Sequence, residues 1–246
     1  MLNGFFIITG TSRGIGEALA CKIVRQGHTV LGVSRTPSES LGSEKKFHHH
    51  PLDLTDASRM SEIMDKVGRL VDNQKFEFVC LVNNASATEP IGPIEKCRPT
   101  EIESHVTIGL LGPMILTSLF MGKFQKNEIR KKVVFISSGL GSRPMPHSSV
   151  YCTSKAGINM FTQCLGLEQK DKAHPFEVVA IGPGMVDTRM QQAMRSKTTD
   201  EFAAVDFFKQ AFADGKLQIA DKVAGKIYSI IENSYEPGKY VNVSEL

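Results

Sequence analysis

The chain has 246 residues, of which 41% are hydrophobic and 22% charged, and its 29 Lys and Arg against 26 Asp and Glu give a formal net charge of +3. So small a charge gives no support for binding to nucleic acid or to a membrane surface, and a chain of this length can bury enough surface to fold without disulfides or a structural metal. The five cysteines form no CxxC pair, no apolar run approaches ~18 residues and no signal peptide pattern precedes the first strand, so we expect a reduced, cytoplasmic protein without a membrane span.

Short β-branched and aromatic runs alternate along the chain with longer segments whose apolar residues recur every three or four positions. The runs and segments predict strands at 5–9, 29–33, 78–83, 133–137 and 177–181, and helices at 15–26, 57–72, 100–124 and 149–169. Because the strands are apolar throughout, the pattern indicates an α/β fold with one domain over 1–246, a doubly wound parallel sheet with helices on both faces. The polar stretch 189–216 predicts a small helical lid over the substrate, with a plain surface excursion as the alternative.

Two polar runs lie outside these elements. Arg130-Lys131-Lys132 precedes an apolar strand and is interpreted as a solvated helix end. His48-His49-His50 is interpreted as a surface loop, because consecutive residues of an extended segment point to opposite faces and no acidic or cysteine partner lies nearby in the sequence. We therefore expect no metal site.

The first predicted strand runs directly into a glycine-rich loop and then into a helix of apolar period. Glycines allow a tight turn, a close approach of the backbone to a pyrophosphate and close packing of helix on strand, while the free N–H groups at the helix N-terminus attract phosphate. The loop predicts nucleotide binding by Gly10, Ser12, Arg13, Gly14, Ile15 and Gly16.

The residues after the second predicted strand bear on the choice of cofactor. A carboxylate there would accept hydrogen bonds from the ribose 2′-hydroxyl of NAD, but the strand ends in Gly32-Val33-Ser34-Arg35, without an acid. Arg35 and Arg13 could bind a 2′-phosphate through charge-assisted hydrogen bonds, which favours NADP(H). The alternative is that both are ordinary surface arginines.

Tyr151 and Lys155 are four residues apart in the predicted helix 149–169 and therefore share one face. Reduction of a ketone needs a proton for the oxygen, and a tyrosine with a pKa of ~10 is a poor acid–base group at neutral pH. An ammonium group nearby lowers that pKa, so we expect Lys155 to tune Tyr151 and also to hold the nicotinamide ribose. Taken alone, the pair would indicate only an amphipathic helix face.

The order of these motifs, with the glycine spacing TGxxxGxG, resembles the short-chain dehydrogenase/reductase family over nearly the whole chain. The resemblance implies a Rossmann fold, a homodimer formed through the helices 100–124 and 149–169, and catalysis by Ser138 with the Tyr–Lys pair, Ser138 hydrogen-bonding the substrate oxygen. Ser137 is then a strand-end residue. The resemblance also implies cofactor contacts by Asp53, Leu54, Asn84, Ala85, Pro183, Gly184, Val186 and Thr188. For Asp53, a helix cap is the alternative.

Two positions depart from the patterns that the resemblance brings. Gly109 stands where many members of the family have an asparagine of the proton relay, and a glycine inside a helix predicts a local irregularity. The last third of the chain resembles sepiapterin reductases and the bacterial reductases of aromatic 1,2-diketones such as benzil. Asn242 stands where sepiapterin reductases have an aspartate for the pterin, and an amide suits the donors of a pterin less well, which favours a diketone.

We therefore expect an NADPH-dependent carbonyl reductase acting on a small aromatic or vicinal diketone. Sepiapterin reduction is the alternative substrate, and a non-catalytic, NADPH-binding regulator is the alternative of another class. Substrate contacts are expected from Leu140, Met185, Met190 and Asn242. The aromatic residues of 189–216 would either line an apolar lid or form its own core; they are Phe202, Phe207, Phe208 and Phe212.

Overall fold

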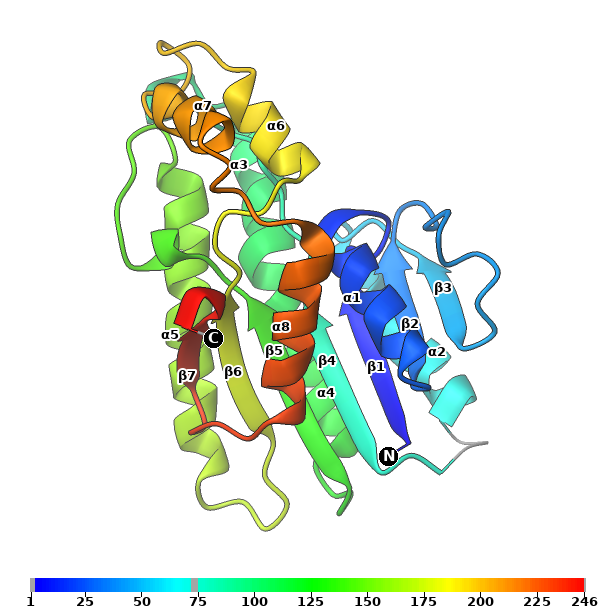
Figure 1. Ribbon diagram of the computed structural model, residues 1–246. Coiled ribbons are helices and arrows are strands. Elements are labelled where there is room, and N and C mark those ends of the chain that lie inside the picture. The colour runs from blue at the N-terminus through cyan, green and yellow to red at the C-terminus, as the bar shows by residue number, and fades with distance from the viewer. Residues whose placement is uncertain (1–2, 72–74, 246) are drawn as a thin grey trace.

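Within residues 3–71 and 75–245, which the computed structural model describes, seven strands form one sheet in the order β3-β2-β1-β4-β5-β6-β7 (Figure 1). Every pairing of neighbours is parallel. The sheet grows first to one side of β1 and then to the other, so it is doubly wound, as predicted. The strands are β1 (Gly4–Thr9), β2 (Thr29–Ser34), β3 (Phe47–Pro51), β4 (Phe78–Asn83), β5 (Arg130–Ile136), β6 (Glu177–Gly182) and β7 (Lys239–Asn242).

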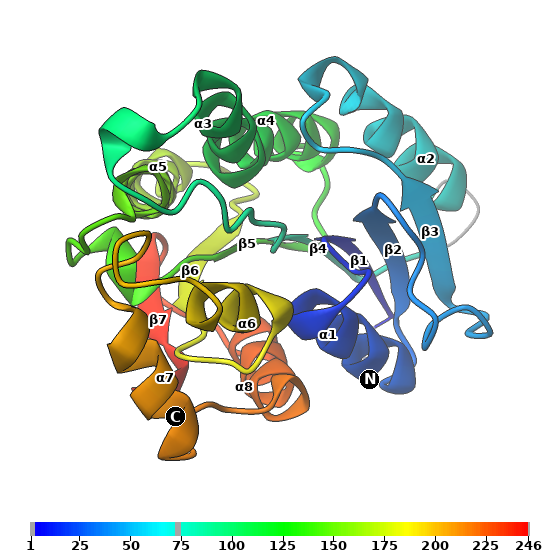
Figure 2. The same ribbon diagram turned by 90° about the horizontal axis from the view of Figure 1, so that it is seen from above.

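Helices cover both faces of the sheet because alternate side chains of each strand point to opposite sides. Phe5 and Ile7 of β1 belong to the core under α2, α4 and α5, whereas Phe6 and Ile8 belong to the core under α1 and α8. Figure 2 shows these helical layers on the two sides of the sheet. The helices are α1 (Gly14–Arg25), α2 (Ser61–Val71), α3 (Pro99–Val106), α4 (Gly112–Phe124), α5 (Ser149–Gln169), α6 (Arg189–Arg195), α7 (Val205–Ala213) and α8 (Ala220–Glu232).

The helices predicted at 15–26 and 149–169 are confirmed as α1 and α5. The helix predicted at 57–72 is divided into a short 3-10 turn, Ala57–Arg59, and α2. Its predicted end at Asp72 lies outside the described residues.

The long helix predicted at 100–124 is irregular at the expected place. α3 passes into a π-helical turn over Thr107–Leu111 before α4 begins. This turn contains Gly109, so the predicted irregularity is confirmed. A π turn contains one residue more than the α-helical repeat, and such turns are frequent at functional sites.

By length and composition alone, the helical stretch Pro99–Phe124 is apolar enough to cross a membrane, contrary to the expectation from the sequence. In this fold, α4 contributes Leu116 and Phe120 to the core, which accounts for part of its apolar composition. Because a core helix meets the same criterion, the composition is weak support for a membrane span.

β5 begins at Arg130, so the interpretation of 130–132 as a solvated helix end was wrong. Lys131 and Lys132 are buried, with 2% and 1% of their surfaces exposed. The ammonium of Lys132 donates to the carbonyl oxygen of Asn233, just after α8, at 2.6 Å and lies 3.0 Å from the carboxylate of Glu177. Carbonyl groups at a helix end lack partners within the helix. Lys132 is buried because its ammonium supplies hydrogen bonds to these carbonyl groups at the end of α8.

The histidine run 48–50 lies in β3, at the edge of the sheet, so its interpretation as a surface loop was wrong. Consecutive histidines contact different residues, as expected for side chains that point to opposite faces of a strand. The Nε2 atom of His49 lies 3.1 Å from the hydroxyl of Ser34, and that of His50 lies 3.9 Å from the carboxylate of Glu62. β3 is half-buried, and among the described strands it pairs with β2 alone, which explains why its polar sequence did not indicate a strand.

The segment 189–216 is helical and lies beyond the C-terminal ends of the strands, as predicted (Figure 1). Phe202 and Phe208 are buried in a small core of its own. Phe207 and Phe212 are exposed at 58% and 51%. The buried pair therefore holds the segment together, and none of the four lines the cavity described below.

Candidate active site

The loop after β1 requires glycine for two different reasons. Gly10 and Gly14 have φ angles of 75° and 64°, in the left-handed region that side chains disfavour. A Cβ on Gly16 would lie 2.3 Å from the carbonyl oxygen of Gly10, so only glycine lets helix α1 start this close to the strand. Asn84 secures the loop, because its side-chain amide donates to the carbonyl oxygen of Thr9 at 2.9 Å.

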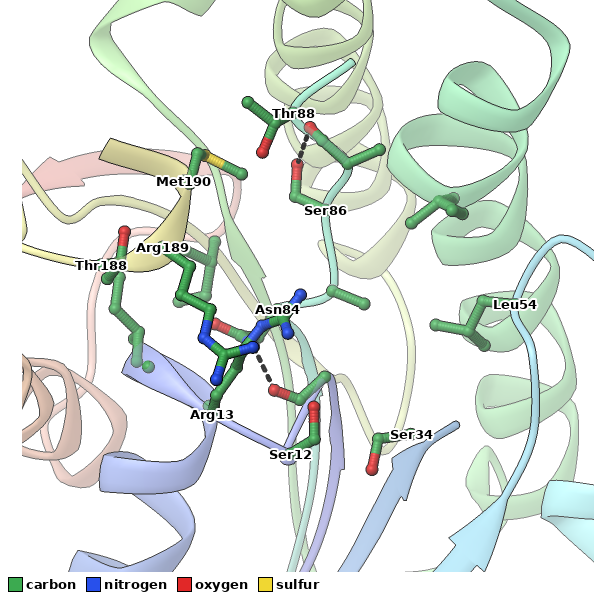
Figure 3. Close-up of a pocket in the computed structure, with 18 of the residues that line it drawn as sticks. Ser12, Arg13, Ser34, Leu54, Asn84, Ser86, Thr88, Thr188, Arg189 and Met190 are labelled. Carbon is green, nitrogen blue, oxygen red and sulfur yellow. Dashed lines mark hydrogen bonds between the residues drawn. The ribbon is translucent and has the colours of Figure 1, made fainter. Parts of the chain in front are cut away.

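A cavity of about 1080 Å³ opens beside this loop, at the C-terminal ends of the strands (Figure 3). Such a crevice is where open parallel sheets bind their ligands. The predicted site residues on its wall are Gly10, Ser12, Arg13, Gly14, Ile15, Gly16, Arg35, Asp53, Leu54, Asn84, Ala85, Tyr151, Lys155, Pro183, Thr188 and Met190. Most of the predicted cofactor residues are thus brought together in one place.

Six predicted site residues are not on that wall; they are Ser138, Leu140, Gly184, Met185, Val186 and Asn242. Val186 is 4% exposed and packs in the core under α1 and α8. Met185 packs against the core of the segment 189–216. The amide oxygen of Asn242 accepts hydrogen bonds from the backbone N–H and the hydroxyl of Ser244, at 3.0 and 2.9 Å. In this structure the side chains of Met185, Val186 and Asn242 therefore contact other parts of the protein instead of the cavity.

The wall also contains residues that the sequence did not single out. The segment 86–89 lines the cavity directly after Asn84 and Ala85, and Arg189 lines it from the start of α6. Because parallel strands end at the same edge of a sheet, the position of 86–89 after a predicted strand could have indicated it. Arg189 is the first residue of the predicted lid 189–216, but nothing in the sequence singles it out as a cavity residue, since its place depends on how α6 packs over the sheet.

Ser138, Tyr151 and Lys155 meet at the end of β5. The hydroxyl of Ser138 accepts a hydrogen bond from the N–H of Leu140 at 3.2 Å, in the short turn that follows the strand. The ammonium of Lys155 donates to the carbonyl oxygen of Ile136 at 2.9 Å and lies 5.6 Å from the centre of the Tyr151 ring. The hydroxyl of Ser137 donates a hydrogen bond to the side-chain oxygen of Asn159 at 2.6 Å. Ser137 is thus a hydrogen-bonding residue at the end of the strand, as expected.

Burial dominates the acid–base properties of this cluster. It raises the pKa of Tyr151, against a smaller lowering by a hydrogen bond with Ser138. It also lowers the pKa of Lys155 to about 8. The expectation that Lys155 lowers the pKa of Tyr151 is wrong for this structure, because desolvation of the phenolate outweighs any attraction to the ammonium. Tyr151 is consequently a protonated phenol at neutral pH, which is the form that can donate a proton.

The far end of the cavity carries two arginines, Arg13 and Arg35, with little compensating negative charge among the described residues. The side chain of Arg35 is 70% exposed, and its only ion pair among the described residues is a loose one with Asp53, at 3.9 Å. No ion pair of Arg13 is found within 3–71 and 75–245. Asp53 also accepts hydrogen bonds from the N–H and hydroxyl of Thr55, at 3.0 and 2.9 Å, in the turn after β3. The 3-10 turn Ala57–Arg59 has Asp56 at its N-cap, so Asp53 is not its cap, contrary to the alternative interpretation. The glycine loop and these arginines fit a dinucleotide phosphate group.

A doubly wound sheet with this loop and this cluster defines a class: an oxidoreductase whose redox chemistry is carried by a bound nicotinamide nucleotide. The family model described as short chain dehydrogenase matches residues 5–199. The chain belongs to this family, and it is an enzyme acting on CH–OH and C=O groups.

The relatives narrow the place of the chain within the family. It is 36% identical over 247 residues to the benzil reductase ((S)-benzoin forming) of Bacillus cereus, covering 98% of this chain and 99% of that one. It is 27% identical to the sepiapterin reductase of Bos taurus, over 96% and 92% of the two chains. The crystal structure of the KRED1-Pglu enzyme has the same fold, with a TM-score of 0.84 at 24% identity over 97% of this chain and all of that one. The predicted similarity to benzil and sepiapterin reductases is confirmed.

Proposed function

We propose that this protein is an NADPH-dependent carbonyl reductase of an aromatic or vicinal diketone, with Tyr151 as the proton donor. The observation that supports this most is that Tyr151 and Lys155 line the same cavity as the glycine loop and Arg35. The residues that would bind the cofactor and the tyrosine that would donate the proton therefore line one cavity.

Each residue of the cluster has a distinct role in the proposed reaction. When bound, the reduced nicotinamide supplies a hydride to the carbonyl carbon. The phenol of Tyr151 donates its proton to the carbonyl oxygen as negative charge develops there. The hydroxyl of Ser138 donates a hydrogen bond to the same oxygen and holds the carbonyl against Tyr151. The ammonium of Lys155, oriented by the carbonyl of Ile136, bonds the cofactor ribose and stabilises the phenolate that remains.

The preference for NADPH over NADH rests on charge. Arg13 and Arg35 lie on the cavity wall, and Arg35 is held only loosely by Asp53. An arginine on a 2′-phosphate makes charge-assisted hydrogen bonds that a 2′-hydroxyl cannot match. The carboxylate of Asp53, which lies 3.9 Å from Arg35, is committed to Thr55.

The preference for a diketone over a pterin rests on similarity and on Asn242. The chain is closer to the Bacillus cereus benzil reductase, at 36% identity, than to the Bos taurus sepiapterin reductase, at 27%. Where sepiapterin reductases have an aspartate, Asn242 has one acceptor, which is already used by Ser244, and an NH₂ group that is a donor like those of a pterin. Sepiapterin reduction remains the alternative.

A substrate panel tests the proposal. The absorbance of NADPH is followed with benzil, sepiapterin and simple aldehydes, and turnover of benzil is expected to be the fastest. The Tyr151→Phe variant is expected to lose turnover while it still binds NADPH. The matched control is Tyr228→Phe, which removes the hydroxyl of a tyrosine on α8 that contacts His28 and leaves turnover intact.

The possible results separate the hypotheses. Turnover by Tyr151→Phe at the wild-type rate would refute the proposed mechanism. A wild-type protein that binds NADPH and reduces no member of the panel would favour the non-catalytic regulator instead.

We further propose a cytoplasmic homodimer formed through α4 and α5. Large apolar side chains are exposed along this side: Leu111 at 43%, Met114 at 38%, Met160 at 59% and Leu167 at 62%. A second copy would remove them from water. Light scattering after gel filtration is expected to give twice the chain mass, and a monomer would refute this assembly.

A further inference from the structure

One arginine on the cavity wall has no role in the reaction proposed above. Arg189 is the first residue of α6, and its side chain is exposed. Among the ion pairs and side-chain hydrogen bonds within 3–71 and 75–245, none includes its guanidinium. Asp187, two residues earlier, is paired instead with Arg195, at 3.1 Å. Arg189 therefore presents to the cavity a positive charge that no acid of the described residues neutralises.

The acids on the cavity wall are engaged with other residues. Each has a partner at hydrogen-bond or ion-pair distance: Asp53 has Thr55, Glu89 has Lys197, Glu101 has Arg98 and Asp187 has Arg195. Apart from the loose contact of Asp53 with Arg35, they leave the arginines of the wall to a ligand. A cavity with this balance of charge attracts an anion.

The start of α6 packs against the glycine loop. A Cβ built on Gly14 would lie 3.5 Å from the Cγ2 atom of Thr188, the residue before Arg189. Figure 3 shows Arg189 on the side of the cavity where Ser12 and Arg13 of this loop lie. The side chain of Arg189 and the loop therefore border the same part of the cavity.

The position of Arg189 indicates which phosphate it would meet. In a doubly wound sheet, the pyrophosphate of a dinucleotide lies at the N-terminus of the first helix, and the adenine ribose lies after the second strand. Thr188 contacts Gly14, which begins α1, so Arg189 is at the first of these places. Arg35 directly follows β2 and is at the second. The two arginines are thus placed for different phosphates.

We propose that Arg189 binds the pyrophosphate of the nicotinamide dinucleotide, together with the N–H groups of the glycine loop. This inference rests on the proposed function, which requires the dinucleotide. A guanidinium presents several N–H donors in a planar fork, so it can bond oxygens of both phosphates and carries the opposite charge. The segment 189–216 would then bind the cofactor through its first residue.

A binding measurement without carbonyl substrate tests the role of Arg189. Dissociation constants are measured by calorimetry for NADPH and NADH. Arg189→Ala is expected to raise both constants by the same factor, about tenfold, which is within the contribution of a hydrogen bond to a charged group. Arg35→Ala is the contrasting variant, because it should weaken NADPH alone.

Fragments of the cofactor identify the phosphate. ADP-ribose contains the pyrophosphate and lacks the 2′-phosphate, whereas adenosine 2′-monophosphate contains only the 2′-phosphate. Arg189→Ala should weaken the binding of ADP-ribose and leave that of adenosine 2′-monophosphate unchanged. The opposite result would place Arg189 at the 2′-phosphate and overturn the proposal.

Two further variants separate a contact with phosphate from a structural role in α6. An acid is favourable in the first turn of a helix, so Arg189→Glu should not harm α6 itself. It should nevertheless weaken both cofactors more than Arg189→Ala, because a carboxylate repels the pyrophosphate. Lys209→Ala removes an exposed cation of α7 that does not line the cavity, and it should leave both dissociation constants unchanged.

The other source of an anion is the substrate, and the same variants exclude or establish it. Phenylglyoxylate resembles half of benzil and carries a carboxylate. If Arg189→Ala raised the KM for phenylglyoxylate and left the dissociation constants of NADPH and NADH unchanged, Arg189 would bind an anionic substrate group and the proposal would be overturned. An Arg189→Glu variant that binds both cofactors like the wild type would overturn it as well. Because binding is measured without turnover, failure of the substrate panel would overturn the proposed reaction alone.

Discussion

Replacing Lys132 with methionine tests whether a buried ammonium joins β5 to the end of α8. The Nζ atom donates to the carbonyl oxygens of Ile230, Ile231 and Asn233 at 3.3, 2.8 and 2.6 Å. It also lies 3.0 Å from the carboxylate of Glu177. Methionine has a similar length and donates nothing, and each buried acceptor left unsatisfied costs about 1–3 kcal/mol.

Two features reduce the cost. Arg130 keeps its two contacts with Glu177, at 2.6 and 3.1 Å, and donates to Ile231 at 3.3 Å, so neither the acid nor that carbonyl is left alone. The desolvation that lowers the pKa of Lys132 is also relieved. The buried carbonyl of Ile230 and the part-buried carbonyl of Asn233 lose their donor, so we expect the free energy of unfolding to fall by about 2–3 kcal/mol, most of it from Ile230. For a chain of this size that corresponds to a Tm lower by roughly 4–12 °C.

Urea unfolding followed by circular dichroism measures this loss, with a thermal melt as a second reading. The matched control is Lys131→Met, the preceding residue of β5, which is also buried but whose ammonium, among the described residues, contacts only the carbonyl of Asn127 and the ring of Phe176. It is expected to lose about 1 kcal/mol. A Lys132→Met variant as stable as the wild type, or no less stable than Lys131→Met, would refute the reasoning.

Three further outcomes are expected. Because burial lowers the pKa of Lys155 to about 8, its ammonium is present below that pH and lost above it, so kcat/KM for NADPH should fall as pH rises through about 8. The Arg35→Ala variant should raise the KM for NADPH about tenfold and leave the KM for NADH unchanged. A hydrogen bond to a charged group contributes ~1.5–3 kcal/mol to binding, whereas the exposed ion pair of Arg35 with Asp53 contributes little to stability. The Asn242→Asp variant should raise turnover of sepiapterin relative to benzil, measured as the ratio of the two kcat/KM values.

Each of these has an outcome that would contradict it. A profile that stays flat up to pH 10 would show that the charge of Lys155 is not needed. For Arg35, the control is Arg69→Ala on α2, an exposed arginine away from the cavity, and equal effects of the two substitutions would contradict recognition of a 2′-phosphate. An unchanged substrate ratio in Asn242→Asp would remove the argument against a pterin.

The features that the sequence predicted are those set by neighbouring residues. The spacing of Gly10, Gly14 and Gly16 follows from the turn itself, and two of them adopt the positive φ angles that only glycine tolerates well. Tyr151 and Lys155 share a face because both lie on one helix, which the apolar period located correctly. Local patterns were sufficient here because the constraint lies within one element.

The features that the sequence did not predict are set by elements far apart in the chain. Lys132 is buried because the end of α8, about a hundred residues later, supplies acceptors for it. The strand β3 forms because the edge of β2 offers a partner, whatever the polarity of His48 or His49. The pKa of Tyr151 depends on how much water the surrounding helices exclude, which spacing within α5 does not record.

The π-helical turn at Thr107–Leu111 lies between α3 and α4. Deleting one residue from it would change the orientation of α3, which a single substitution does not do. Successive residues of an α-helix are turned by about 100°, so loss of the extra residue would rotate all of α3 by that angle relative to α4. The ring of His105 would then no longer pack against Tyr151 of α5. Ser104 and Ile108, which now line the cavity, would point in a different direction. Gain or loss of one residue here would therefore exchange a whole helix face at the site in one evolutionary step.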